Sequence, residues 1–163
     1  MRAIDRTLVD EVWCGMSAYA PARVASEAQL FLELQPHAAA FARAVAGGFD
    51  PAVQKAALGL AFLLFKVLEA SLGCPFPLLA EERIMAAHAG TRAWLAEHDG
   101  AAPAQLLEAL EHGAHPSLPV YILSVFYEGG TAAGDCDATV RASLFCLLKT
   151  LTDALDLGRV EEA

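Results

Sequence analysis

The residues best suited to bind a metal ion lie in one short stretch, which contains Glu108, Glu111, His112 and His115. Glu108 and His112 are four residues apart, as are Glu111 and His115, so each pair would share one face of a helix. Imidazole nitrogens and carboxylate oxygens are common ligands of zinc and other divalent metals. The stretch is therefore a candidate metal site of a metal-dependent enzyme.

The same stretch also fits an ordinary helix end. Gly113 and Pro116 would interrupt a helix between the two histidines and directly after them. A histidine near a helix C-terminus interacts favourably with the negative end of the helix dipole. The sequence has no second cluster of matching spacing, and the duplicated Glu-x-x-His pattern of di-iron bundles is absent. We therefore expect no bound cofactor.

Two lysines, Lys66 and Lys149, lie inside the most apolar segments of the chain. In a functional role, both amines would face a shared pocket, where a desolvated lysine binds an anion or acts with a lowered pKa. In a structural role, each methylene stem packs on the core while the ammonium reaches water. Glu69 and Asp153, three and four residues further on, are natural partners for the structural role.

His88 and Tyr121 complete the candidate ligand-binding set. His88 shares the apolar face of an expected helix with Ile84 and Leu95, and Tyr121 lies in another apolar helix. Together with Lys66 and Lys149 they could orient a small apolar ligand, because such sites are mostly apolar with a few polar groups. A histidine on an apolar face is, however, more often a hydrogen-bonded core residue.

These candidates belong to a pattern that occurs twice, in residues 35–72 and 115–155. Each unit reads as a proline-initiated short helix, a glycine stop and a longer apolar helix that contains one lysine. Pro36 lies 30 residues before Lys66, and Pro116 lies 33 residues before Lys149. The pattern predicts a duplicated helical hairpin. Two unrelated hairpins are the alternative, because ordinary hairpins share these features.

The periodicity predicts an all-α, single-domain bundle of about seven to eight helices over residues 1–155, followed by a polar tail over 156–163. Asp50-Pro51 is a strong helix start, since the aspartate can cap free amides and proline suits the first position. Ser26, with Gln29 three residues on, resembles a capping box that opens a second helix. Pro36 should break that helix.

The two longest apolar helices, about 51–71 and 137–155, should pack against each other at the centre of the bundle. The first of these helices is apolar on nearly every side, as expected of a helix surrounded by other helices. This arrangement predicts burial of six leucines: Leu60, Leu64, Leu68, Leu144, Leu147 and Leu151.

The charge balance bears on the partners of this chain. Eleven Lys and Arg residues face 20 Asp and Glu residues, which gives a net charge of −9. A nucleic-acid surface needs clustered basic residues, so we expect no nucleic-acid partner. Hydrophobic residues make up 56% of the chain, but the run Ala56–Phe65 is bounded by Lys55 and Lys66 and is shorter than the roughly 20 residues of a membrane span.

The N-terminal residues and the cysteines indicate the compartment. The segment after Met1 lacks the apolar stretch of a signal peptide. The four cysteines show no pairing pattern, and three lie among apolar neighbours, where we expect buried thiols. A reducing cytoplasmic location is the simplest expectation.

For function, the apolar excess favours a non-enzymatic helical interaction module that self-associates as a homodimer or binds a partner helix. A small domain with so many apolar residues should leave some of them on its surface. Two alternatives are a protein that binds a small apolar ligand between its central helices and a metal-dependent enzyme that uses the cluster over 108–115.

Overall fold

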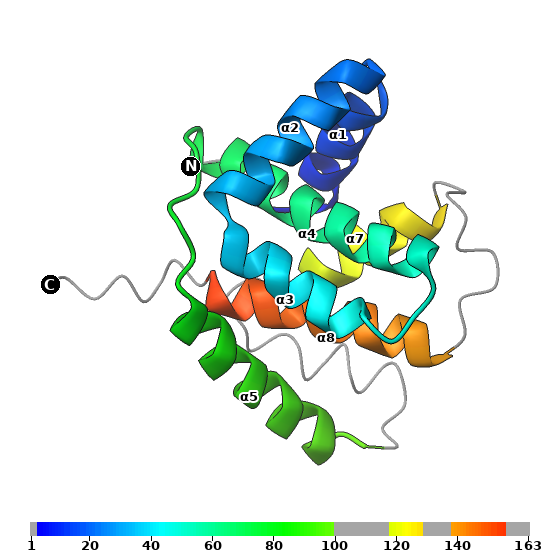
Figure 1. The fold of residues 1–163 in the computed structure, drawn as a ribbon, viewed down its shortest axis with the longest axis vertical. Coiled ribbons are helices and arrows are strands. Elements are labelled where there is room, and N and C mark those ends of the chain that lie inside the picture. Colours follow the sequence, from blue (N-terminus) through cyan, green and yellow to red (C-terminus); the bar gives the residue numbers. More distant parts are fainter. Residues whose placement is uncertain (1–2, 100–117, 129–137, 156–163) are drawn as a thin grey trace, which may run out of the picture.

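Apolar residues that recur at three- and four-residue spacing favour helices, and proline, aspartate and glycine mark several of the helix ends. The computed structural model describes residues 3–99, 118–128 and 138–155, and every regular element among them is an α-helix. The helices shown in Figure 1 are α1 (Arg6–Ser17), α2 (Pro21–Leu34), α3 (Pro36–Ala46), α4 (Pro51–Leu72), α5 (Glu81–Glu97), α7 (Leu118–Glu128) and α8 (Ala138–Ala154). The all-α prediction is confirmed.

The start of α4 follows the local signal in the sequence. Asp50 Oδ1 accepts hydrogen bonds from the amides of Ala52 at 2.8 Å and Val53 at 3.1 Å, and Pro51 occupies the first helical position. These bonds satisfy amides that have no partner within the helix. The predicted break at Pro36 is also confirmed, because α3 begins there.

The expected cap at Ser26 is wrong. The second helix already begins at Pro21, and Ser26 lies inside it, with its hydroxyl donating to the Arg23 carbonyl at 3.0 Å. With proline at the first helical position, the cap is Ala20, six residues before Ser26. The helix α2 is therefore longer at its N-terminus by more than one turn.

The segment after α4 forms one wall of the site described below. Gly73 ends the helix with φ +74°, and its amide donates to the Glu69 carbonyl at 2.8 Å. This left-handed conformation suits glycine, which has no Cβ to clash. Residues 75–80 then run without helical structure, and the next helix begins at Glu81.

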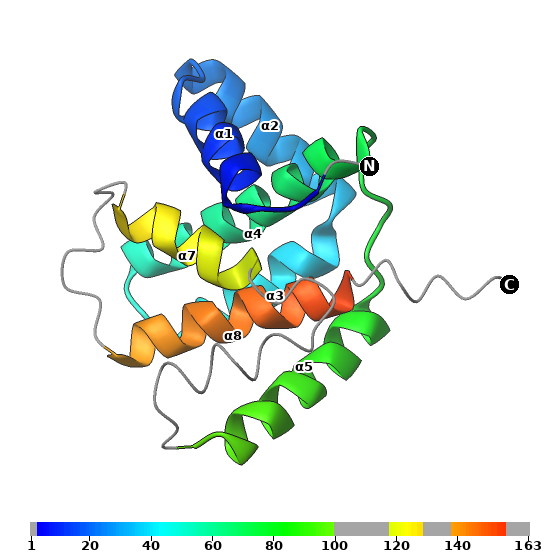
Figure 2. The same ribbon diagram turned by 180° about the vertical axis from the view of Figure 1, so that it is seen from behind.

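The helices surround α4, which crosses the middle of the molecule. In Figure 1, α1 and α2 lie on one side of α4, and α3 and α8 lie on the other, with α5 outermost. Seen from behind in Figure 2, α7 runs beside α4 and contacts α1 and α8. This arrangement leaves α2 at the edge of the bundle, where Phe31 is its one buried residue.

The predicted core is confirmed. All six leucines expected at the centre are at most 2% exposed, and α4 packs directly against α8. None of the described helices is long and apolar enough to cross a membrane.

The pairs α3–α4 and α7–α8 follow the order that a duplication predicts. Residues 115–117, where the second unit would start, lie outside the described residues, so the duplication stays a prediction.

Candidate functional site

A pocket of about 180 Å³ opens where α2, the C-terminal half of α4 and the segment 73–80 meet. Its apolar lining consists of Leu30, Phe31, Leu34, Phe62, Phe65, Pro75 and Phe76. Its polar lining consists of Glu27, Gln35, Lys66 and Glu69. The pocket is therefore an apolar depression with a few charged groups, and it includes Lys66 from the set predicted by sequence.

Four phenylalanine rings build the apolar part of the pocket. The ring of Phe31 lies 5.6 Å from that of Phe62 and 5.4 Å from that of Phe65, measured between centroids. Phe76 meets Phe65 edge to face at 5.7 Å. Tilted and edge-to-face rings at these separations attract each other beyond the effect of burial alone. The rings thus join α2, α4 and the segment 73–80 into one wall.

Two half-exposed leucines lie on α2 at the pocket. Leu30 is 50% exposed and Leu34 is 48% exposed, and both line the pocket. They are four residues apart, so they share one face of the helix. They extend the apolar surface of the pocket outward along α2 toward solvent.

The polar edge of the pocket centres on Lys66. Its Nζ lies 3.1 Å from Glu27 Oε2 and 3.1 Å from Glu69 Oε2, so one ammonium bridges α2 and α4. The hydrogen bond from Lys66 lowers the pKa of Glu27, although desolvation acts against it. Burial tends to lower the pKa of Lys66, but the hydrogen bonds to Glu27 and Glu69 prevail and raise it. The contact between Glu27 and Lys66 therefore favours the charged form of both groups.

Gln35 fixes the segment 73–80 against the junction of α2 and α3. Its Nε2 donates to the carbonyls of Phe76 at 3.3 Å and Pro77 at 2.9 Å, and its Oε1 accepts from the Leu79 amide at 3.0 Å. Gln35 is only 3% exposed. Because these three bonds occupy both ends of the amide, Gln35 shapes the pocket and has little capacity left for an occupant.

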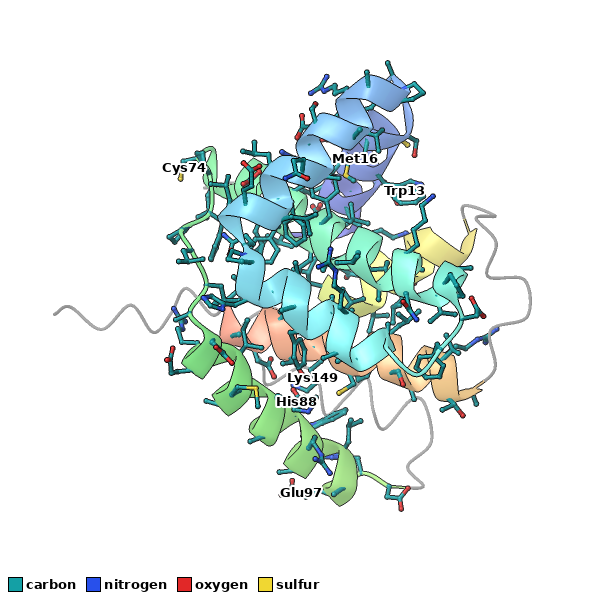
Figure 3. All side chains as sticks on the ribbon, in the orientation of Figure 1. Trp13, Met16, Cys74, His88, Glu97 and Lys149 are labelled. Carbon is teal, nitrogen blue, oxygen red and sulfur yellow. The ribbon has the colours of Figure 1, made fainter. Side chains whose placement is uncertain are left out.

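The other predicted ligand-binding residues lie elsewhere. His88 on α5 packs edge to face on Phe41 of α3 at 5.2 Å, and Tyr121 on α7 packs partly buried against the core. Lys149 on α8 pairs with Asp153 at 2.7 Å. Figure 3 shows His88 and Lys149 far from Cys74, which marks the end of α4 near the pocket. None of these three candidates lines the pocket that contains Lys66.

The surroundings of Lys149 are a second concentration of polar groups, between α5 and α8. Its Nζ lies 5.2 Å from the ring centroid of Trp94, and its side chain is 11% exposed. Thr91 and Thr150 are fully buried, and within the described part of the chain the hydroxyl of Thr91 has no hydrogen-bond partner. Lys149 has Asp153 as the partner predicted for its structural role, but its side chain is largely buried against the indole ring instead of reaching water.

The predicted metal site cannot be placed in this fold. Glu108, Glu111, His112 and His115 all lie outside the described residues. Over residues 3–99, 118–128 and 138–155, no group of three or more histidine, cysteine, aspartate or glutamate side chains is arranged to hold a metal ion. The cluster over 108–115 therefore stays a prediction from sequence.

The cysteines are more exposed than their neighbours in sequence indicated. Cys14 and Cys74 are exposed, and Cys146 is half-buried. The expectation of buried thiols is wrong for Cys14 and Cys74 because one lies on the outer face of α1 and the other just beyond α4. Burial raises the pKa of the Cys146 thiol, even though the Thr150 hydroxyl lowers it in part.

Lys66 is the one predicted ligand-binding residue that lines the pocket, and among the polar lining residues Glu27 and Gln35 were not predicted from the sequence. The pairing of Lys66 with Glu69 could be predicted because both lie on one helix, three residues apart. Glu27 and Gln35 reach groups on distant segments, and no local pattern marks such contacts. The only available signal was Gln35 itself, a polar residue between Leu34 and Pro36 at a helix break.

Comparison with known proteins finds no relative of this chain. No protein-family model matches the chain, and neither a curated protein nor a solved structure does. The function is therefore inferred from the fold and the pocket.

Proposed function

We propose that this chain is a non-enzymatic interaction module that binds a helix of a partner protein. An apolar side chain of the partner would enter the pocket between α2, α4 and the segment 73–80. The observation that carries this proposal is the open aromatic pocket continued by two half-exposed leucines, Leu30 and Leu34, on one face of α2.

The size of the pocket favours one side chain over a large ligand. Pockets for drug-sized molecules have volumes of roughly 300–1,000 Å³, whereas this one has about 180 Å³. An apolar cavity of about 150 Å³ holds a benzene molecule, so the pocket accommodates a phenyl ring or a leucine side chain. Leu30 and Leu34 then offer further apolar contact outside the pocket, as grooves that bind amphipathic helices do.

The polar groups of the pocket support binding more than catalysis. Lys66 is held by two carboxylates and its pKa is raised, so its amine is not available as a neutral nucleophile or base. Gln35 is engaged in three hydrogen bonds to the segment 73–80. These side chains already have structural partners.

A library selection tests the proposal. Amphipathic helices displayed on phage would be selected on the full chain and the best binders measured as free peptides by fluorescence anisotropy. We expect Leu34→Gln to lower the affinity for the selected peptides by at least about tenfold, the loss typical of an interface anchor. Met85→Gln is the matched control, because Met85 is 53% exposed on α5 and lies outside the pocket.

The Leu34→Gln variant decides whether the peptides bind at the proposed surface. If the selected peptides bind the Leu34→Gln variant as tightly as they bind the native chain, this surface is excluded as the docking site. Circular dichroism and thermal melting of both variants would establish that they fold like the native chain.

A small apolar ligand is the second candidate, and the wall of four neighbouring phenylalanine rings in the pocket is the observation that favours it. Native mass spectrometry of untagged protein would reveal such a ligand as extra mass that disappears on denaturation. Extra mass that is retained by Met85→Gln and lost in Leu34→Gln would place a small molecule in the pocket instead of a helix.

A further inference from the structure

We infer that the partner helix is basic, with a lysine or arginine within one turn of the apolar side chain that enters the pocket. This inference rests on the proposed function and specifies the chemistry of the partner. Its cation would contact the carboxylates of Glu27 and Glu69 at the polar edge of the pocket.

The charges that line the pocket do not balance. The ammonium of Lys66 lies 3.1 Å from one carboxylate oxygen of Glu27 and 3.1 Å from one of Glu69. These three side chains are the charged groups of the pocket lining, and their charges sum to −1. The further charged side chains of α2 are Arg23, which contacts Glu27 at 3.3 Å, and Glu33. Including these two leaves the sum at −1, and the whole chain carries −9. An approaching cation is therefore attracted.

The carboxylates retain room for another donor. An ionised carboxylate has about four acceptor positions. Besides the Lys66 ammonium, Glu27 Oε1 accepts from Arg23 Nε at 3.3 Å and Glu69 Oε1 accepts from the Phe76 amide at 3.4 Å, and both of these contacts are long. The side chains of Glu27 and Glu69 are 22% and 27% exposed, so a partner can reach them from solvent.

The aromatic wall favours a cation as well. Phenylalanine rings present negative faces, to which an ammonium within about 6 Å is attracted. Lys66 Nζ already lies 5.9 Å from the ring centroid of Phe62. The edge of the pocket thus accommodates an ammonium between carboxylates and rings, and an anion would meet both carboxylates unfavourably. This result argues against the anion-binding role considered for Lys66 from sequence.

The test uses the same helix library, with the positions that flank the apolar anchor varied among lysine, arginine, glutamate and glutamine. We expect lysine and arginine to be enriched among the binders that depend on Leu34. The best binder would then be compared with a version in which each flanking basic residue is replaced by glutamate. The glutamate version should bind more weakly, and the difference should shrink at high salt.

We predict that two variants of the full chain change the affinity for the basic peptide in opposite directions. Lys66→Met removes the competing cation and retains an apolar stem, so the affinity should rise about two- to fivefold. Glu69→Gln removes a negative charge and retains an acceptor for the Phe76 amide, so the affinity should fall by about the same factor. Thermal melting would establish that both variants are folded at the temperature of the measurement.

The outcomes distinguish this inference from the proposal on which it rests. If no selected peptide depends on Leu34, the proposed function itself fails. If peptides depend on Leu34 but show no enrichment of basic residues, or if Lys66→Met weakens the basic peptide, the docking site stands and the basic partner is excluded.

Discussion

Gln35 connects two parts of the chain that form the pocket, and it does so through the three hydrogen bonds of its side-chain amide. It lies between α2 and α3, yet its amide binds the backbone of Phe76, Pro77 and Leu79. These backbone groups would otherwise be left partly unpaired near the core, which is costly. The residue thus holds the wall of the pocket that follows α4.

Replacing Gln35 by alanine should lower the free energy of unfolding by about 1–3 kcal/mol, because the Leu79 amide and two carbonyls lose their partner. Urea denaturation monitored by circular dichroism would measure the change. Gln29→Ala is the control, since Gln29 is exposed and donates only to Glu33 at 2.9 Å. That control should stay within about 0.5 kcal/mol of the native chain. Equal losses in the two variants would contradict the role of Gln35.

The ion pair of Glu27 with Lys66 should give a pH-dependent stability. The pKa of Glu27 is lowered in the folded chain, so its contribution is fully present above its ordinary value of 4.5 and is lost as the pH falls through the folded value. The pKa of Lys66 is raised, so its contribution is present below its ordinary value of 10.5 and is lost only at higher pH. Between these limits the pair stabilises the fold.

Glu27→Gln should therefore cost less than about 1 kcal/mol at neutral pH, as expected for a partly exposed pair. The difference from the native chain should shrink below pH 4.5. Urea denaturation from neutral to acidic pH would follow it. A difference that stays constant over that range would show that the carboxylate charge of Glu27 does not stabilise the fold.

The cysteines should differ in reactivity. Cys14 and Cys74 are exposed, whereas Cys146 is half-buried with a raised pKa, so it has less of the reactive thiolate at neutral pH. We expect iodoacetamide to modify Cys14 and Cys74 faster than Cys146, as measured by peptide mass spectrometry over time. Modification of Cys146 at the same rate would indicate that α8 opens readily.

At the scale of whole helices, α4 and α2 have opposite roles. Ten residues of α4 are buried, including Leu64 and Leu68, while α2 has Phe31 as its one buried residue. Apolar burial is the main stabilising contribution to folding, so α4 carries far more of the stability. Most of the surface of α2, including Leu30 and Leu34, is then available to a partner.

Leu64→Ala should therefore lower the free energy of unfolding by about 2–5 kcal/mol, because Leu64 is fully buried and its removal leaves a cavity. Leu78→Ala is the control, since Leu78 is 60% exposed and should change stability by less than about 0.5 kcal/mol. Urea denaturation of the two variants would compare them. A loss below about 1 kcal/mol for Leu64→Ala would mean that its surroundings collapse to fill the space.

At the scale of the whole molecule, the acidic surface bears on whether the chain pairs with itself or with another protein. Two copies of the chain, each with a charge of −9, repel one another. A partner with a positive charge is attracted by the same negative surface. The proposed surface on α2 lies at the edge of the bundle, as Figure 1 shows, so a partner helix can approach it freely.

We therefore expect the isolated chain to be a monomer in native mass spectrometry at low micromolar concentration. The matched pair of variants, Leu34→Gln and Met85→Gln, would show whether any dimer depends on the proposed surface. A dimer that is dispersed by Leu34→Gln alone would assign this surface to a second copy of the chain instead of a foreign helix.

The amino-acid sequence by itself determined the helices and the centre of the fold. The start of α4 at Asp50-Pro51, the break at Pro36 and the pairing of Lys149 with Asp153 all depend on residues within one helical turn. The burial of Leu64 follows from a helix that is apolar on nearly every side. Such features are predictable because neighbours in sequence are sufficient to produce them.

The pocket, in contrast, was decided only by the tertiary structure. Glu27 meets Lys66, and Gln35 meets Leu79, because packing brings together segments far apart in the chain. The same packing leaves Leu30 exposed and Phe31 buried, although the two are adjacent apolar residues on one helix. A periodic pattern shows which residues share a helix face, but which face meets another helix depends on how all the helices fit together.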